Sequence, residues 1–450
     1  MAFFESNQFL IYSILFLTGL LILAVFLFKL FHQAFLFYKQ SLYKKAIEWT
    51  ILEFKIPREV LKTPRAMEQF FINLHSLKNE PGDLLEKYID GEVTLWWSLE
   101  IASFGGKLHF YIRTPKKHKK MVESGMHAQY PNVELIEVED YLNKFPSATK
   151  EFYESNENIF GSEFFLDKPN FYPIITYDQF FDKPVKIDEK RQIIIDPISA
   201  LIEVLAGIHK EENVFIQILI SPVGEDWKEE GKNFVNKKLG KEEKRGGGGF
   251  NQVIYEWTKN FLWAPTEYPV WAEEKEAVKK ELPTISDYDS IKAIQDKLSG
   301  QGFESLIRFL YIAPNSIYST NFARRGIRGA FNQYASPNLN FFGNNKLVET
   351  RTRWVYYPHV FVEKRVEARK QRLLYNFKNR LLPEKLSFGK FITSHIFNFN
   401  NKSKTSVFVA SELATIYHIP AEQVLTAPHI ERTESKKMGP PAGLPIFEEE

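Results

Sequence analysis

The sequence TLWWSLEIASFGGKLHFYIR at residues 94–113 decides the predicted fold, because it contains two strand-like segments around a pair of glycines. Strands are predicted at 94–103 and 107–113. Between them, Gly105 and Gly106 supply the backbone freedom that a two-residue hairpin turn requires. The stretch therefore predicts a β-hairpin.

The segments on either side of the hairpin complete an α+β unit. Residues 51–56 alternate apolar and charged side chains, as in a half-buried strand, and Thr63 with Pro64 marks a helix start. The expected strands are 51–56 and 133–138, and the expected helices are 63–77 and 116–129. The order strand, helix, strand, strand, helix, strand predicts a ferredoxin-like βαββαβ domain over residues 49–150.

A second α+β domain is predicted over residues 151–358, and its element order permits another ferredoxin-like unit. A charged, glycine-containing segment at 225–250 is expected to be a flexible insertion, followed by inserted helices. The expected strands are 174–177, 214–220, 304–312 and 354–357, and the expected helices are 197–209, 252–262, 286–298 and 314–334.

A long apolar run near the N-terminus predicts a membrane anchor. The run begins at Phe9, ends at Phe28 and contains no charged side chain, and about 20 such helical residues cross a bilayer core of about 30 Å. The anchor and its helical stalk occupy residues 1–48. The lysines lie after the run, so the positive-inside rule predicts a single-pass protein of the cell membrane with its N-terminus outside and its body in the cytoplasm. These lysines are Lys29, Lys39, Lys44 and Lys45.

The C-terminal region is predicted to contain a charged helix at 362–382 and a small module within residues 359–430, in which Ser411 caps a short helix. Residues 431–450 are rich in proline and glycine and are predicted to be a disordered tail. Such an extended arm could dock on a partner. The residues expected to dock are Pro440, Pro441, Leu444 and Pro445.

Composition and motifs favour binding over catalysis. The chain has 450 residues, a formal net charge of +2 and no cysteine, which excludes disulfides and thiolate chemistry. The glycine-containing segments lack the spacing and the lysine of a phosphate-binding P-loop. The sequence contains neither a His-Glu-x-x-His motif nor a Gly-x-Ser-x-Gly motif. We therefore expect no enzyme activity, no cofactor and no metal site.

Two basic groups are candidate contacts for a polyanion or an acidic partner. One group crowds the start of the helix at 116–129, where cations oppose the helix dipole. The other lies in the helix at 314–334 and offers guanidinium groups suited to phosphates. A solvated surface is the alternative interpretation of both. The groups are Lys116, Lys117, Lys119 and Lys120, and Arg324, Arg325 and Arg328.

Several stretches together carry a resemblance to a known class of protein. They are TPRAMEQFFINLHSL at 63–77, FYIRTPKKHKK at 110–120, HAQYPNVELIEVEDY at 127–141, FIQILISP at 215–222 and SELATIYHIP at 411–420. The chain resembles the N-terminal, non-ATPase half of bacterial membrane-anchored proteins that are similar to conjugation and type IV secretion ATPases of the HerA-like class. In such relatives an ATPase domain follows the proline-rich stretch, whereas this sequence ends there with Glu450.

The resemblance implies an accessory role without ATP hydrolysis. We expect a membrane-anchored, non-catalytic scaffold of a conjugation or type IV secretion-like machine that positions a separately encoded HerA-like ATPase. The alternative is a membrane-tethered protein that binds nucleic acid through its basic groups, and such binding would weaken steeply with salt. A homo-oligomer is compatible with either role.

Overall fold

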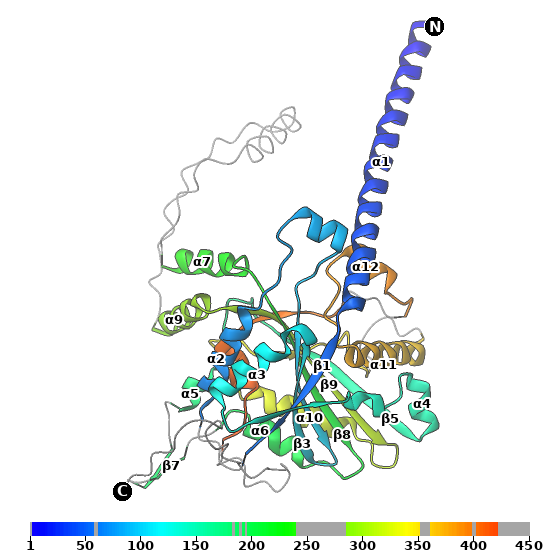
Figure 1. Ribbon diagram of the computed structural model, residues 1–450. Helices are drawn as coiled ribbons and strands as arrows, with labels where there is room; N and C mark the ends of the chain where they lie inside the picture. The colour runs from blue at the N-terminus through cyan, green and yellow to red at the C-terminus, as the bar shows by residue number, and fades with distance from the viewer. Residues whose placement is uncertain are drawn as a thin grey trace, which may run out of the picture.

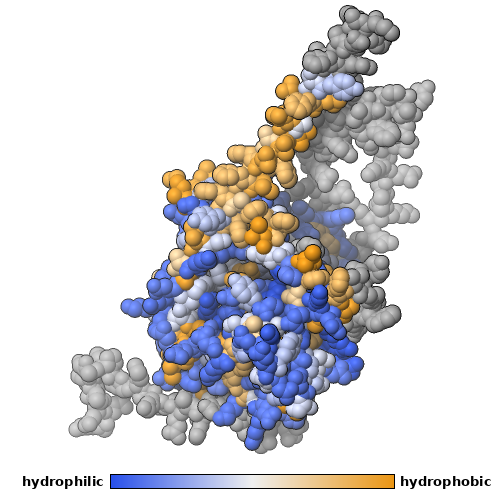
Figure 2. Space-filling model, turned by 90° about the vertical axis from the view of Figure 1, so that its right-hand side faces the viewer, coloured by the Kyte–Doolittle hydropathy of each residue, from blue (hydrophilic) through white to orange (hydrophobic). Residues whose placement is uncertain are grey.

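The computed structural model describes residues 2–57, 62–181, 185–188, 191–193, 196–239, 285–351, 361–397 and 402–421. A single long helix, α1 (Ala2–Ala46), projects from a body built on one large sheet (Figure 1). Apolar side chains cover this helix where it leaves the body (Figure 2). The predicted mixed α+β class with a long apolar N-terminal helix is confirmed.

Nine of the described strands form one antiparallel sheet. Eight of them follow the order β10-β5-β9-β8-β2-β3-β1-β4, and β11 pairs with β9 beyond the end of β5. The strands are β1 (Trp49–Lys55), β2 (Trp97–Phe104), β3 (Lys107–Pro115), β4 (Glu134–Val138), β5 (Glu157–Leu166), β8 (Asn213–Pro222), β9 (Gly302–Pro314), β10 (Phe342–Asn344) and β11 (Ser406–Val409). A separate hairpin joins β6 (Val185–Asp188) to β7 (Arg191–Ile193).

The sheet has two halves that meet at β2 and β8. From the outer edge inward, the first four strands lie in the order β4, β1, β3, β2, which is fourth, first, third, second along the chain. The strands β5, β8, β9 and β10 lie in the same order from the opposite edge. At the junction, Trp97 faces Ile220 and Phe104 faces Asn213, so the residues predicted as two domains share one continuous sheet.

Helices cover one face of the sheet with an extensive apolar core that runs through both halves. Met67, Phe70 and Phe71 from one helix and Ala323 and Ile327 from another lie in this same core. The covering helices are α2 (Pro64–His75), α3 (Lys119–Gln129), α6 (Ser199–Ala206), α10 (Thr320–Asn332) and α13 (Ala410–Ile416).

The opposite face carries a smaller core beneath α11 (Val362–Lys378). Leu373, Leu374 and Phe377 of this helix pack against Phe215 and Leu310 of the sheet. The other described helical elements are η1 (Glu86–Asp90), η2 (Lys116–His118), η3 (Tyr141–Lys144), α4 (Thr149–Glu154), α5 (Tyr177–Phe181), α7 (Trp227–Lys238), α9 (Ile285–Ser299) and α12 (Ser387–Ile392).

The structure corrects the predicted edge of the second half. Residues 174–176, most of a predicted strand, have no regular structure. The first strand of the second half is instead β5, which the sequence prediction overlooked. Gly161 and Glu163 interrupt the apolar pattern of this strand, yet both are buried. The observed outer strand is β10, whereas the strand predicted at 354–357 and the helix predicted at 252–262 lie outside the described residues.

Two local predictions also differ from the structure. The segment predicted as a flexible insertion contains α7, whose Val235 packs in a core with Ile291 and Ile294 of α9. The short helix of the C-terminal module is not capped by Ser411. Its first turn follows Val409. The amide of Val409 donates a 3.0 Å hydrogen bond to the Glu412 carboxylate, because a glutamate at this position can satisfy a free amide at a helix start.

Candidate functional site

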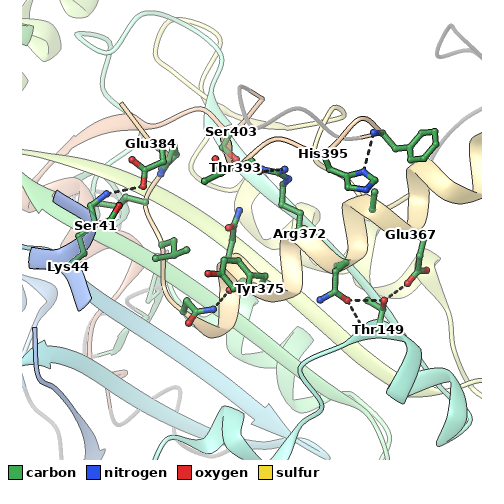
Figure 3. Close-up of a pocket in the computed structure, with 18 of the residues that line it drawn as sticks. Ser41, Lys44, Thr149, Glu367, Arg372, Tyr375, Glu384, Thr393, His395 and Ser403 are labelled. Carbon is green, nitrogen blue, oxygen red and sulfur yellow. Dashed lines mark hydrogen bonds and ion pairs between the residues drawn. The ribbon is translucent and has the colours of Figure 1, made fainter. Parts of the chain in front are cut away.

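A cavity of about 1400 Å³ lies between the base of α1, the helices α4 and α11, and the chain that follows α11. Figure 3 shows Lys44 and Glu384 at one end of it and Thr149 and Glu367 at the other. We call this space the juxtamembrane cavity, because it adjoins α1, the helix that is long and apolar enough to cross a membrane. Residues that are distant in the sequence meet here only because α1 and α11 pack on the same side of the body.

The base of α1 forms one wall of the juxtamembrane cavity. Lys44 makes a 2.9 Å ion pair with Glu384, and both side chains are largely shielded from solvent. About two turns toward the N-terminus, the ring of Phe37 packs edge-on against Phe388 with 6.1 Å between ring centroids. These contacts fix the end of the long helix against the chain that leads into α12.

The floor of the cavity is aromatic and carries one guanidinium group. Trp49 and Trp96 pack with 4.9 Å between their ring centroids, and the guanidinium of Arg113 lies 4.0 Å above the Trp49 ring. Burial, assisted by the nearby charge of Arg380, lowers the pKa of Arg113 to about 10. Among the described residues, the buried Nη1 atom of Arg113 has no hydrogen-bond partner.

The far wall is a polar network between α4 and α11. The amide of Thr149 donates a 2.9 Å hydrogen bond to Gln371, and its hydroxyl bonds Glu367. Further along α11, Arg372 donates a 2.7 Å bond to the carbonyl of Thr393. With an apolar floor, a stacked guanidinium and these polar walls, the cavity suits a ligand that joins an anionic group to an apolar portion.

A buried ionic cluster lies directly beneath the cavity floor. Arg380 is 1% exposed, and its Nε and Nη2 atoms donate to the two oxygens of Glu100 at 3.0 and 3.1 Å, while Nη1 and Nη2 donate to Asp140. Trp96 of the floor donates a 2.8 Å bond to the carbonyl of Arg380. Burial alone would raise the pKa of Glu100, but the charge and hydrogen bonds of Arg380 outweigh it and lower that pKa.

The cluster belongs to a row of polar residues that crosses the sheet. In register, Glu163 faces Arg308, Arg308 faces Gln217, and Gln217 faces Glu100. Arg308 donates a 2.8 Å bond to Glu163, and Gln217 donates a 3.0 Å bond to the carbonyl of Phe377. Each charge in this stretch therefore meets a partner, as buried charges require.

Sequence reasoning missed this row, although it left a signal. Glu100, Glu163 and Arg308 each interrupt a strand whose neighbours are buried on both faces. A charge at such a position predicts an internal partner, because an unpaired buried charge is strongly destabilising. The partner Arg380 adopts a left-handed backbone conformation, with φ of 51°, and no local pattern points to it.

The first predicted basic group lies at the end of β3 and the start of α3. Lys116 pairs with Glu48 at 3.2 Å, and Lys119 pairs with Glu137 at 2.5 Å. The side chains of Lys117 and Lys120 are exposed. Half of this group therefore already has acidic neighbours, which reduces its local positive charge.

The second predicted group lies on α10, in the other half of the sheet. Arg325 and Arg328 are exposed, whereas Arg324 is half-buried and donates a 3.4 Å bond to Asn321. The helix α10 packs on α6 and β5, whereas α3 packs on α2 and β3, so the two groups belong to separate parts of the body. The predicted docking residues Pro440, Pro441, Leu444 and Pro445 lie outside the described residues.

Within the described ranges, no three His, Asp or Glu side chains are placed together as a metal ion would need. The one helix there that is long and apolar enough to cross a membrane is α1, over Tyr12–Ala46. Fold and site together define a mixed α+β protein with a candidate membrane-spanning helix and an adjoining cavity.

The chain belongs to the family described as a domain of unknown function (DUF8128), whose model matches residues 38–432. The matched region includes the end of α1 from residue 38, the whole nine-stranded sheet and α11. No curated protein matches the sequence.

Proposed function

We propose that this protein is a single-pass membrane protein whose body is a non-catalytic scaffold held at the bilayer surface. One observation carries the proposal: α1 continues without a break from its apolar part into the body and packs there against α12 and η1. A motor or channel partner could use such a body as a fixed platform.

The exposure of α1 supports the membrane part of the proposal. Phe16, Ile22 and Phe28 are 71%, 70% and 69% exposed, and the exposed apolar side chains surround the helix. In water such a surface is unfavourable by about 25 cal/mol per Å² of apolar area, whereas lipid tails accommodate it. The lysines that follow the apolar run favour a cytoplasmic body with the N-terminus outside.

We also propose that each half of the sheet is a ferredoxin-like unit and that the second repeats the first. The shared strand order, fourth, first, third, second, supports this relationship. The partner that we propose is a HerA-like ATPase, on the strength of the sequence resemblance. Binding of nucleic acid through Lys117, Lys120, Arg325 and Arg328 is the competing function.

Topology is testable with cysteine labelling, because the chain has no cysteine of its own. A membrane-impermeant maleimide should label Ser6→Cys in intact cells, whereas Lys150→Cys, whose side chain is 86% exposed, should react only after lysis. The opposite pattern would overturn the orientation, and release of the chain by alkaline carbonate would overturn the anchor.

The scaffold role is testable by crosslinking the full chain in native membranes and identifying the attached proteins. Recovery of a P-loop ATPase of the HerA-like class is the expected result, and it should survive Lys117→Glu with Lys120→Glu. Recovery of nucleic acid that is lost in this double variant and at high salt would favour the competing function instead.

A further inference from the structure

Two segments of the body carry unusually exposed apolar side chains beside α1. Leu84, Leu85 and Ile89 at η1 are 72%, 61% and 56% exposed. Phe391, Ile392 and Ile396 at and after α12 are 73%, 55% and 77% exposed. Single exposed apolar residues are common on soluble surfaces, but six of them in two short segments that flank one apolar helix form a patch. We call these six residues the apolar collar.

The collar is fixed to α1 at a defined height. On one side, the ring of Tyr88 packs on His32 with 5.1 Å between centroids. On the other side, the amide of Phe388 donates a 3.2 Å bond to Gln33, and its ring packs on Phe37. Figure 1 shows η1, in light blue, and α12, in orange, on either side of the base of α1.

The same height corresponds to the surface of a bilayer that α1 would cross. His32 follows Phe28, the end of the uncharged apolar run, by four residues, which is about 6 Å along a helix. Each polar headgroup layer is about 5–8 Å thick, because a bilayer measures about 40–45 Å with its headgroups and about 30 Å without them. The apolar surface continues from the helix onto the top of the body (Figure 2).

The charges near the collar indicate how it would bind lipid. The η1 segment contains Asp83, Glu86 and Asp90 beside Lys87, so it is acidic overall. Attraction to anionic headgroups therefore does not hold this side, and burial of apolar side chains at the headgroup boundary is the remaining favourable contribution. On the other side, Lys390 of α12 precedes Phe391, so apolar burial is the contribution that both sides share, and the occupant that fits the collar is the interface of the bilayer.

We propose that the apolar collar enters the headgroup layer of the bilayer that α1 crosses, so the body has three membrane contacts instead of one. This inference rests on the proposed membrane span. With α1 alone, the body could tilt about the stalk. With η1 and α12 also inserted, the body is held at a fixed orientation, and the juxtamembrane cavity lies just below the headgroups.

The test uses the cysteine-free full chain in phosphatidylcholine vesicles, with single cysteines that carry an environment-sensitive fluorophore. Nitroxide-labelled lipids quench a probe that lies in the bilayer. The probe positions are Leu85→Cys and Phe391→Cys in the collar, Ile22→Cys in α1, and Met121→Cys as a control. Met121 is also exposed and apolar, at 55%, but it lies on α3, away from α1.

Quenching at positions 22, 85 and 391 is expected to exceed that at position 121 several-fold and to persist at high salt. Quenching at 22 without quenching at 85 and 391 would overturn the collar and leave the span intact. Absence of quenching at 22 would overturn the span and the collar together. Contact between collar probes on two copies, without quenching by lipid, would assign the patch to a protein interface and overturn the inference.

Discussion

The two halves of the sheet place different residues at matching positions of the same face. Glu53 of β1 and Glu163 of β5 belong to the same polar row across the sheet. Tyr111 of β3 lies between Glu53 and the junction strand β2, and Arg308 of β9 lies between Glu163 and the junction strand β8. Two residues earlier, β1 has Ile51 where β5 has Gly161. The helix α11 packs on β5 and β9 and covers this face of the second half. On the same face of the first half, Ile51 instead lies in a cluster with Tyr141 and Val138.

This difference shows how one strand order can serve two packing arrangements. Gly161 lets α11 approach the sheet, and the buried Glu163 beneath it is paired by Arg308. In the first half, Ile51 fills the corresponding space, and the buried Glu53 reaches two partly exposed partners, His109 at 2.7 Å and Lys55 at 2.9 Å. The carboxylate at this position is therefore paired with a fully buried arginine in one half and with partly exposed side chains in the other.

The largest expected effect comes from breaking the buried pair of the second half. Replacement Arg308→Met leaves Glu163 as an unpaired buried charge, which should lower the free energy of unfolding by about 3–5 kcal/mol. Urea denaturation of the purified full chain in detergent measures it. The double variant Arg308→Met with Glu163→Leu should regain most of the loss, because no charge then remains uncompensated. A loss below about 1 kcal/mol in the single variant would contradict the assigned role of the pair.

The sequence predicted the parts of this sheet that have local patterns. The hairpin of β2 and β3 was predicted from apolar segments around Gly105 and Gly106, whose φ angles are 56° and 89°. The strand β5 was missed because Gly161 and Glu163 interrupt its apolar pattern. Distant parts of the chain explain them, since Leu373 of α11 lies against Gly161 and Arg308 of β9 pairs with Glu163.

The juxtamembrane cavity could not be predicted in the same way. Its walls come from α1, from α4 and from the chain around α11, so no single stretch of sequence carries a signal for it. The membrane-like helix was predictable because length and apolar composition are local properties. The basic groups were found as clusters, but their acidic neighbours Glu48 and Glu137 lie in other elements.

A smaller effect is expected where α11 meets the sheet. In Gly161→Ala the new methyl group would lie 2.5 Å from Leu373 Cδ2 and 2.5 Å from the carbonyl oxygen of Phe309. Such overpacking typically costs about 1–3 kcal/mol. The matched change in the first half, Ile51→Val, removes a methylene group and should cost about 0.5–1.5 kcal/mol without moving α11.

Hydrogen exchange of the α11 amides distinguishes these two variants. Exchange should accelerate in Gly161→Ala, because the helix is displaced from β5, and should stay unchanged in Ile51→Val. Equal exchange in both variants would show that the glycine is not what admits the helix.

The smallest expected effect belongs to Glu53 of the first half, because its partners His109 and Lys55 are partly exposed to solvent. Burial alone would raise the pKa of Glu53, but hydrogen bonds from His109 and Lys55 outweigh it and hold that pKa below its usual value. Because the pKa is lower in the folded state, Glu53 contributes stability at pH values above its ordinary pKa and loses it as the pH falls through the folded value. Glu53→Gln should therefore cost about 0.2–1 kcal/mol at neutral pH, and the difference from the unchanged protein should vanish in acid. A difference that grew in acid, measured by urea denaturation across pH, would mean that folding raises the pKa of Glu53, which would contradict its pairing with His109 and Lys55.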